Sequence, residues 1–236
     1  MRNRKTCFLT GVTFIALFAL LTLLIMTIDV RPVGQNGTNI GFATFNTGFH
    51  ALTGANMTLY TITDWLGLVP IFICMIFGGV GLLQLIKRKS LFKVDKDIII
   101  LGIYYIIVIM AYLIFEMIPV GYRPIPIEGV MEASYPSSTT LLVLSVMPTL
   151  VEQAGRRLSD DLINKLITIF AVLFSLFMVI GRLISGVHWF TDIVGSVLLS
   201  IGLYYLYKGC VLSCRKRGIR GDGSYGVWRK SVGTEK

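Results

Sequence analysis

Long apolar runs separated by short polar segments dominate this chain. Six of the runs are long enough, or nearly long enough, to cross a bilayer as helices. They cover residues 7–28, 65–86, 98–115, 137–151, 162–181 and 188–207. The fourth and sixth are short, and they depend on their polar flanks to reach across. The pattern therefore predicts an all-α integral membrane protein built as a bundle of six transmembrane helices.

The composition and the distribution of charge agree with this class of protein. The chain has 236 residues, of which 54% are hydrophobic and 15% are charged, which is too apolar for an ordinary soluble domain. Nineteen of the 22 Lys and Arg lie in the segments 1–5, 87–97, 152–165 and 208–236, which six alternating helices would place on one side. The positive-inside rule makes that side the cytoplasm. We therefore expect a multi-pass protein of the cell (plasma) membrane, with both termini cytoplasmic and residues 123–135 outside.

The net charge of +9 follows from the same asymmetry and gives no reason to expect a nucleic-acid partner. Segment 208–236 is basic and rich in Gly, so we expect a largely disordered cytoplasmic tail after a transmembrane domain at 1–207. Such a tail typically contacts anionic lipid of the inner leaflet. Nothing in the sequence indicates the oligomeric state.

The segment 29–64 between the first two apolar runs is long for a loop without its own structure. Phe42, Phe45, Phe49 and Leu52 recur in it at helical spacing, which predicts a short helix at the membrane surface. His50 falls within this helix and is one of only two histidines in the chain.

The second histidine lies in the stretch 181–192, which places several ionisable groups among apolar residues. Such groups are costly at membrane depth and usually mark a site. His188 and Asp192 are four residues apart, so the carboxylate could accept a hydrogen bond from one ring nitrogen and leave the other free. Arg182 lies beyond a Ser-Gly break, and its planar guanidinium suits a phosphate. The alternative is a turn between two helices with a structural His–Asp pair.

Two further motifs lie on the same predicted side of the membrane. Arg123-Pro124 follows the third apolar run, and Pro136-Ser137-Ser138-Thr139 opens the fourth. A proline with hydroxyl residues is typical of a helix start. The free N–H groups of that start can bind an anion, although ordinary helix capping explains the same residues.

The order and spacing of these motifs resemble the type 2 phosphatidic acid phosphatase superfamily of membrane lipid phosphate phosphatases. The resemblance covers roughly the last half of the chain and implies a six-helix bundle with its active site at the extracytoplasmic side. It also implies that His188 is a nucleophile that forms a phosphohistidine, and that Asp192 orients it. The phosphate would be held by Arg123 and Arg182 together with the helix start at Ser137, Ser138 and Thr139.

The sequence departs from the family pattern at three positions. Glu116 stands where the family has Lys, Ser138 where it has Gly, and Thr139 where it has the His that protonates the leaving group. Glu116 and His50 are the two residues that we consider as replacement acids. The alternatives are that His50 is a surface residue and that Glu116 forms an ion pair with Arg123.

These observations favour a membrane lipid phosphatase that hydrolyses a lipid phosphomonoester or pyrophosphate. Phosphatidate, phosphatidylglycerol phosphate and polyprenyl pyrophosphate are all candidates, and no residue chooses among them. The alternative is a weak or inactive member of the family that binds or transports a phospholipid or regulates a partner. A phosphotransferase is a third candidate. No His, Cys and carboxylate cluster has metal-ligand spacing, so no metal or other cofactor is expected.

Overall fold

Eight α-helices make up the part of the chain that the structure describes. The structure is a computed structural model, and it describes residues 3–221, with side chains described to residue 214. The helices are α1 (Arg4–Thr27), α2 (Ala43–Thr53), α3 (Met57–Leu66), α4 (Leu68–Arg88), α5 (Lys96–Met117), α6 (Ser138–Arg157), α7 (Asp161–Ile184) and α8 (Phe190–Gly221). The described residues form isolated β-bridges but no strand. The predicted all-α class is therefore correct.

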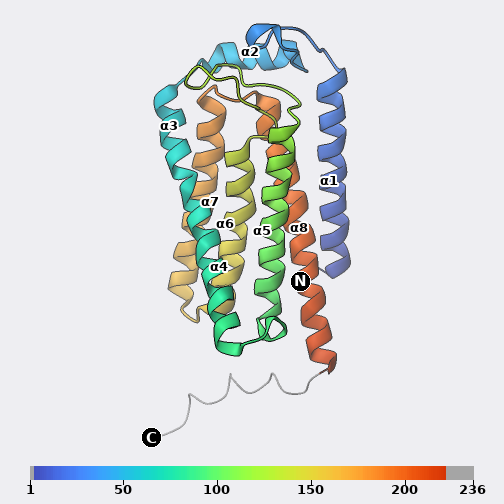
Figure 1. Cartoon of the computed structure of the whole chain (residues 1–236), viewed down its shortest axis with the longest axis vertical. Coiled ribbons are helices and arrows are strands. Elements are labelled where there is room, and N and C mark those ends of the chain that lie inside the picture. The colour runs from blue at the N-terminus through green and yellow to red at the C-terminus, as the bar shows by residue number, and fades with distance from the viewer. Residues whose placement is uncertain (1–2, 222–236) are drawn as a thin grey trace, which may run out of the picture.

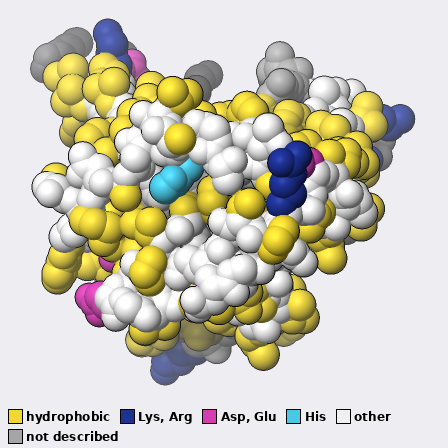
Figure 2. Space-filling view, turned by 90° about the horizontal axis from the view of Figure 1, so that it is seen from above, with side chains coloured by type: hydrophobic (Ala, Val, Ile, Leu, Met, Phe, Trp, Pro, Cys, Tyr) yellow, Lys and Arg dark blue, Asp and Glu magenta, His cyan; other side chains and the backbone are white. Residues whose placement is uncertain are grey.

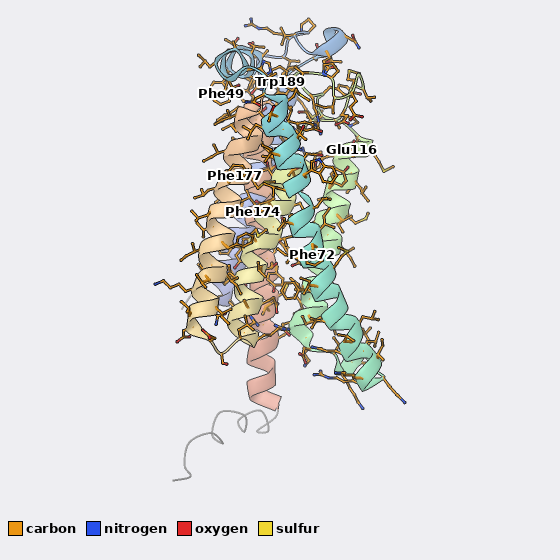
Figure 3. All side chains as sticks on the ribbon, turned by 90° about the vertical axis from the view of Figure 1, so that its left-hand side faces the viewer. Phe49, Phe72, Glu116, Phe174, Phe177 and Trp189 are labelled. Carbon is orange, nitrogen blue, oxygen red and sulfur yellow. The ribbon has the colours of Figure 1, made fainter. Side chains whose placement is uncertain are left out.

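The long helices run side by side along one axis, and α2 lies across one end of the bundle (Figure 1). We call this the α2 end. Among the described residues, five helical segments are long and apolar enough to cross a membrane, namely Arg4–Thr27, Met57–Arg88, Lys96–Met117, Asp161–Ile184 and Phe190–Cys214. Large apolar side chains such as Phe72 and Phe177 are exposed on the outside of the bundle, as contact with lipid requires (Figure 3).

Helix α6 corresponds to the fourth predicted run but is less apolar than the five spans. It lies at the centre of the bundle, where it contacts α4, α5, α7 and α8. Its buried polar side chains face tyrosines of its neighbours: Thr149 Oγ1 lies 2.7 Å from the Tyr105 hydroxyl, and Gln153 Nε2 donates to the Tyr207 hydroxyl at 3.0 Å. Protein groups rather than lipid surround these side chains, so α6 does not need an apolar surface.

Two of the observed helices extend six or more residues beyond their predicted ends. Helix α6 continues from 151 to Arg157, and Arg156 pairs with Glu152 one turn earlier at 2.6 Å. Helix α8 continues past 207 to Gly221, although we expected residues from 208 onward to be disordered. Residues 222–236 of the predicted tail lie outside the described residues.

The long segment between the first two spans contains the short helix that its apolar spacing predicts. This helix, α2, packs over the start of α8, where the rings of Phe45 and Phe49 each lie 5.2 Å from the Phe190 ring. Asn46 is buried below them and donates to Thr191 Oγ1 at 3.0 Å. Few charged side chains are visible on this end of the molecule when it is seen from above (Figure 2). The sequence did not predict α3, which continues through Gly67 into α4 and passes beside the site.

Candidate active site

Two of the predicted site residues lie at the end of α7 and in the turn that follows it. Arg182 lies in the last turn of α7, and His188 lies two residues before α8. Gly186 adopts a left-handed conformation with φ 68°, and a Cβ there would lie 1.8 Å from the carbonyl oxygen of Gly54. The turn therefore packs directly against the loop between α2 and α3, a contact that only glycine permits.

A serine hydroxyl connects His188 with Asp192. Nδ1 of His188 lies 3.6 Å from Oδ2 of Asp192, which is too far for a hydrogen bond. Ser134 Oγ instead donates to Asp192 Oδ2 and lies 3.2 Å from His188 Nδ1. Because the hydroxyl proton is directed to the carboxylate, the oxygen is left to accept from Nδ1–H. The direct hydrogen bond between imidazole and carboxylate that the spacing predicts is thus replaced by a bond through Ser134.

This arrangement leaves the other ring nitrogen of His188 free. The side chain is 3% exposed, and Nε2 has no hydrogen-bond partner among the described residues. Burial, together with the positive charges of Arg123 and Arg182, lowers the pKa of His188 well below its ordinary value. The imidazole is therefore neutral at physiological pH, and with Nδ1 protonated its Nε2 carries the lone pair that a nucleophile needs.

Two buried arginines lie close to this nitrogen. Arg123 and Arg182 are 8% and 1% exposed, and their guanidinium carbons lie 5.8 and 5.0 Å from the centre of the Tyr60 ring. In each, Nε and Nη1 lack a partner among the described residues. Buried N–H donors without partners are rare in native proteins. Donors of this kind suit a tetrahedral oxyanion.

The start of α6 adds backbone N–H donors to those of the two arginines. Ser137 is the N-cap residue and is fully buried, but its side chain does not cap the helix. Its hydroxyl donates instead to Thr140 Oγ1 at 3.1 Å. The first N–H groups of an α-helix have no partner within the helix, so those at Ser138 and Thr139 are available to an anion. Arg182 Nη2 donates to Thr139 Oγ1 at 2.8 Å, which joins this helix start to the arginine.

Comparison with known proteins gives the family of the chain and a similar fold. A family model described as the PAP2 superfamily matches residues 73–216. The chain belongs to the PAP2 superfamily. Its fold resembles the crystal structure of a transmembrane PAP2-type phosphatidylglycerolphosphate phosphatase from Bacillus subtilis, with a TM-score of 0.64 and 16% identity over 86% of this chain and 96% of that one. None of the curated proteins compared with the chain matches it.

The two residues that we considered as replacement acids occupy different places in this PAP2 protein. Glu116 is exposed in the last turn of α5, and it lines a small cleft together with Ser134, Ser138 and His188. It lies at the α2 end of the bundle (Figure 3). His50 lies behind the turn between α7 and α8, and its Nε2 is 3.0 Å from the carbonyl oxygen of Gly186. A carbonyl oxygen accepts only, so this nitrogen is a donor fixed to the turn.

Sequence reasoning did not find four residues that contact the site. Ser134 links His188 to Asp192, and Tyr60 lies against both arginines. Asp64 Oδ1 lies 3.3 Å from Arg182 Nη2, and Glu132 Oε2 lies 2.9 Å from Arg123 Nη2. The partner of Arg123 is therefore Glu132, and not Glu116 as one alternative had it. The one available signal was Asp64, an acidic residue directly before an apolar run.

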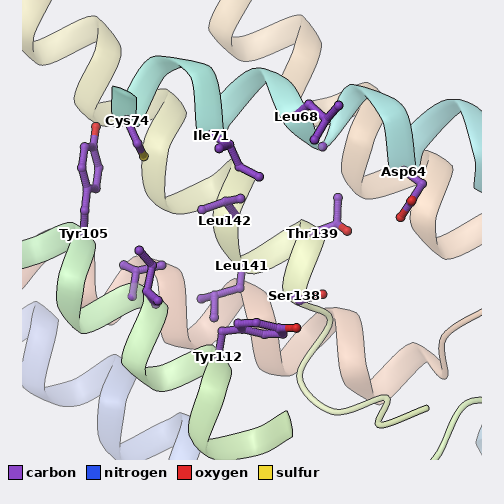
Figure 4. A pocket seen from close by; sticks show the side chains of 13 residues that line it. Asp64, Leu68, Ile71, Cys74, Tyr105, Tyr112, Ser138, Thr139, Leu141 and Leu142 are labelled. Atoms are coloured by element: carbon purple, nitrogen blue, oxygen red, sulfur yellow. The ribbon is translucent and has the colours of Figure 1, made fainter. Parts of the chain in front are cut away.

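An apolar groove runs away from the site along the side of the bundle. Its volume is about 490 Å³, and it passes between α4, α5 and α6 (Figure 4). Asp64, Ser138 and Thr139 lie at one end, while Leu68, Ile71, Leu141 and Leu142 line it farther along. A chain held in this groove would therefore have its polar end next to the arginines.

Proposed function

We propose that this PAP2 protein is a membrane lipid phosphatase that hydrolyses a lipid phosphomonoester or pyrophosphate through a phosphohistidine at His188. The observation that carries the proposal is the buried Nε2 of His188 beside two arginines, because this nitrogen and N–H groups of both arginines have no partner within the described part of the chain. This set combines a nucleophile with donors for a tetrahedral anion, which is what phosphoryl transfer requires.

The proposed hydrolysis uses His188, the two arginines and the start of α6. His188 Nε2 forms a bond to phosphorus as the bond from phosphorus to the lipid oxygen breaks. Arg123, Arg182 and the N–H groups at Ser138 and Thr139 stabilise the charge on the phosphoryl oxygens. The departing oxygen takes a proton from a water molecule in the cleft that Glu116 lines, and the hydroxide left behind is neutralised by the proton released in the next step. Water then attacks the phosphohistidine, releases inorganic phosphate and restores the imidazole.

The groove between α4, α5 and α6 supports a lipid as the substrate. Most of its lining is apolar, and Asp64, Ser138 and Thr139 lie at the end next to Arg182, so a hydrocarbon chain fits it with the phosphate at the arginines. The concentration of Lys and Arg in the segments at the opposite end of the bundle supports an extracytoplasmic site. We therefore place the substrate in the outer leaflet.

The test is turnover by the purified protein in detergent, with phosphatidate, phosphatidylglycerol phosphate and polyprenyl pyrophosphate as substrates and phosphate release as the readout. We expect release from at least one of them, and its loss in His188→Ala. A phosphate label should be trapped on the wild-type protein in a bond that is labile to acid, as the nitrogen–phosphorus bond of phosphohistidine is. Full turnover by His188→Ala would refute the nucleophile assignment.

A lipid-binding protein without turnover is the second candidate. The observation that favours it is Thr139, whose hydroxyl is a weak acid and already accepts a hydrogen bond from Arg182. Saturable binding of phosphatidate that is lost in Arg182→Gln, with no phosphate released from any of the three lipids, would establish this function instead.

A further inference from the structure

Helix α3 brings an aromatic side chain against both arginines of the site. The centre of the Tyr60 ring lies 5.0 Å from the guanidinium carbon of Arg182 and 5.8 Å from that of Arg123. Asp64, one turn later on the same helix, lies 3.3 Å from Arg182 Nη2. Tyr60 precedes residues 73–216, which the PAP2 family model matches, so that match assigns it no role.

The contact with one ring has a physical consequence for the two arginines. Arg123 and Arg182 are both buried and carry the same charge, so they repel each other while no anion lies between them. The face of an aromatic ring attracts a guanidinium group, and the attraction is strongest where water is excluded. A ring that contacts both groups therefore offsets part of their repulsion and limits the orientations that each can adopt.

The start of α3 is fixed to the turn between α7 and α8. The backbone N–H of Asn56 donates to the carbonyl oxygen of Ser185 at 2.9 Å. The Asn56 side chain caps the helix by accepting from the N–H of Leu59, also at 2.9 Å. Asn56 thus joins the first turn of α3 to the segment that carries His188.

The middle of α3 lies directly against the last turn of α7. Thr63 is fully buried, and a Cβ added at Gly181 would lie 2.7 Å from its Cγ2. A side chain at position 181 would therefore force the two helices apart. Because Gly181 has none, α3 comes close enough for Tyr60, one turn before Thr63, to lie against Arg182.

On the basis of the phosphatase function proposed above, we infer that Tyr60 is a positioning residue for phosphoryl transfer. Its ring holds Arg123 and Arg182 in the orientations in which both reach the same phosphoryl group. The contact between Thr63 and Gly181 holds the ring in place. Tyr60 neither gives nor takes a proton, and it acts by keeping the donors for the transition state preorganised.

Two substitutions at Tyr60 test the role of the ring. Tyr60→Phe removes only the hydroxyl and should keep at least about a third of the wild-type kcat, because the attraction comes from the ring face. Tyr60→Leu removes the ring and should lower kcat roughly tenfold. KM should change by less than about twofold, since both arginines keep their charge and their carboxylate partners.

The kinetics are measured with purified protein in detergent, on whichever of the three lipids named above the wild type hydrolyses fastest. Trp65→Leu is the matched control, because Trp65 is an aromatic residue of the same helix whose side chain is 70% exposed. This variant should keep the wild-type kcat. The midpoint of thermal unfolding is recorded for each variant, so that a loss of kcat is compared with any loss of stability.

The contact between α3 and α7 gives a second test that leaves the ring unchanged. Gly181→Ala should displace α3 and lower kcat. Thr63→Ser removes the Cγ2 that the new Cβ would meet but keeps the hydroxyl that donates within α3, so it should restore kcat in the double variant. In the Tyr60→Leu background, Gly181→Ala should cost little more, because the ring that it displaces is already absent.

The outcomes separate this inference from the proposed function. A wild-type kcat in Tyr60→Leu, an equal loss in Tyr60→Phe or Trp65→Leu, or losses that multiply when Tyr60→Leu and Gly181→Ala are combined would each overturn the positioning role. The phosphatase function would then still stand. Release of phosphate from none of the three lipids by the wild type would overturn both.

Discussion

His188 and Asp192 do not touch each other directly. Nδ1 and Oδ2 are 3.6 Å apart, and the Ser134 hydroxyl fills the space between them with one bond to each. Asp192 also accepts from the backbone N–H of Trp189 at 2.8 Å, so the carboxylate is held by the turn that carries the histidine. The position of the imidazole therefore depends on the loop before α6 as much as on α8.

Replacing Ser134 with Ala should lower kcat much more than it changes KM. The substitution leaves Asp192 and Nδ1–H without their shared partner, which costs about 1–3 kcal/mol and corresponds to roughly a tenfold to hundredfold loss of rate. Ser145→Ala is the control, because Ser145 is equally buried but its hydroxyl has no described partner. Steady-state kinetics of both variants on one lipid phosphate decide the point. Equal kcat in wild type and Ser134→Ala would show that the serine only fills space.

The pH dependence of kcat/KM should reflect the lowered pKa of His188. The nucleophile must be neutral, and burial with two nearby arginines keeps it neutral at pH values below its ordinary pKa of 6.5. Activity should therefore stay level as the pH falls through 6.5 and decline only at a lower pH. Arg123→Gln removes one of the positive charges, so it should raise the pKa of His188 and move this decline to higher pH. An unchanged profile in Arg123→Gln would contradict the electrostatic coupling.

Arg182→Lys should reduce kcat/KM by roughly two to three orders of magnitude, as removal of a transition-state donor commonly does. The guanidinium holds Thr139 with Nη2 while Nε and Nη1 remain for phosphate, and a single ammonium cannot do both. Arg157→Lys is the matched control, since Arg157 forms an ion pair with Asp97 at the opposite end of α6. A comparable loss in both variants would mean that the effect is on folding and not on the site.

Much of the site could be predicted because its central groups are close in sequence or marked by helix ends. Arg182, His188 and Asp192 fall within one short stretch, and Arg123 and Ser137 mark the end and the start of apolar runs. Ser134, Asp64 and Glu132 reach the site through folding of loops and through α3. Periodicity and hydropathy carry no information about such contacts, so Ser134 and Glu132 could not be assigned from the sequence, and only the position of Asp64 before an apolar run gave a signal.

The positions of the helices could be predicted from hydropathy, but the central place of α6 and the ends of two helices could not. Five runs are apolar because they face lipid. Helix α6 is surrounded by other helices, so it can carry Thr149 and Gln153 at its buried face. Its central position was not visible in its own hydropathy. The end of α6 was predicted too early because Arg156 and Arg157 have carboxylate partners, Glu152 and Asp97, that let polar residues continue the helix.

Gly186→Ala should destabilise the protein and disturb the site together. The residue has φ 68°, and an added Cβ would meet the Gly54 carbonyl oxygen at 1.8 Å, so the turn that carries His188 would have to move. We expect a lower midpoint of thermal unfolding in detergent and a large loss of turnover. Gly48→Ala is the control, because a Cβ at that helical position meets no neighbour within 4 Å. If Gly186→Ala behaves like Gly48→Ala, the close contact of the two loops does not exist in the protein.

The distribution of Lys and Arg predicts on which side of the membrane the site lies. Lys and Arg are concentrated at the end of the bundle opposite α2, where Arg88 ends α4 and Arg157 ends α6. Transfer of these charges across the membrane is unfavourable, so this end should remain cytoplasmic. Two single-cysteine variants, made on a background without the native cysteines, test this orientation. Glu128→Cys lies in the loop at the α2 end, and Phe92→Cys lies at an exposed position of η2 (Leu91–Lys93). An impermeant maleimide should label position 128 in intact cells and position 92 only after permeabilisation. The reverse pattern would place the arginines and His188 on the cytoplasmic side, and the substrate would then have to come from the inner leaflet.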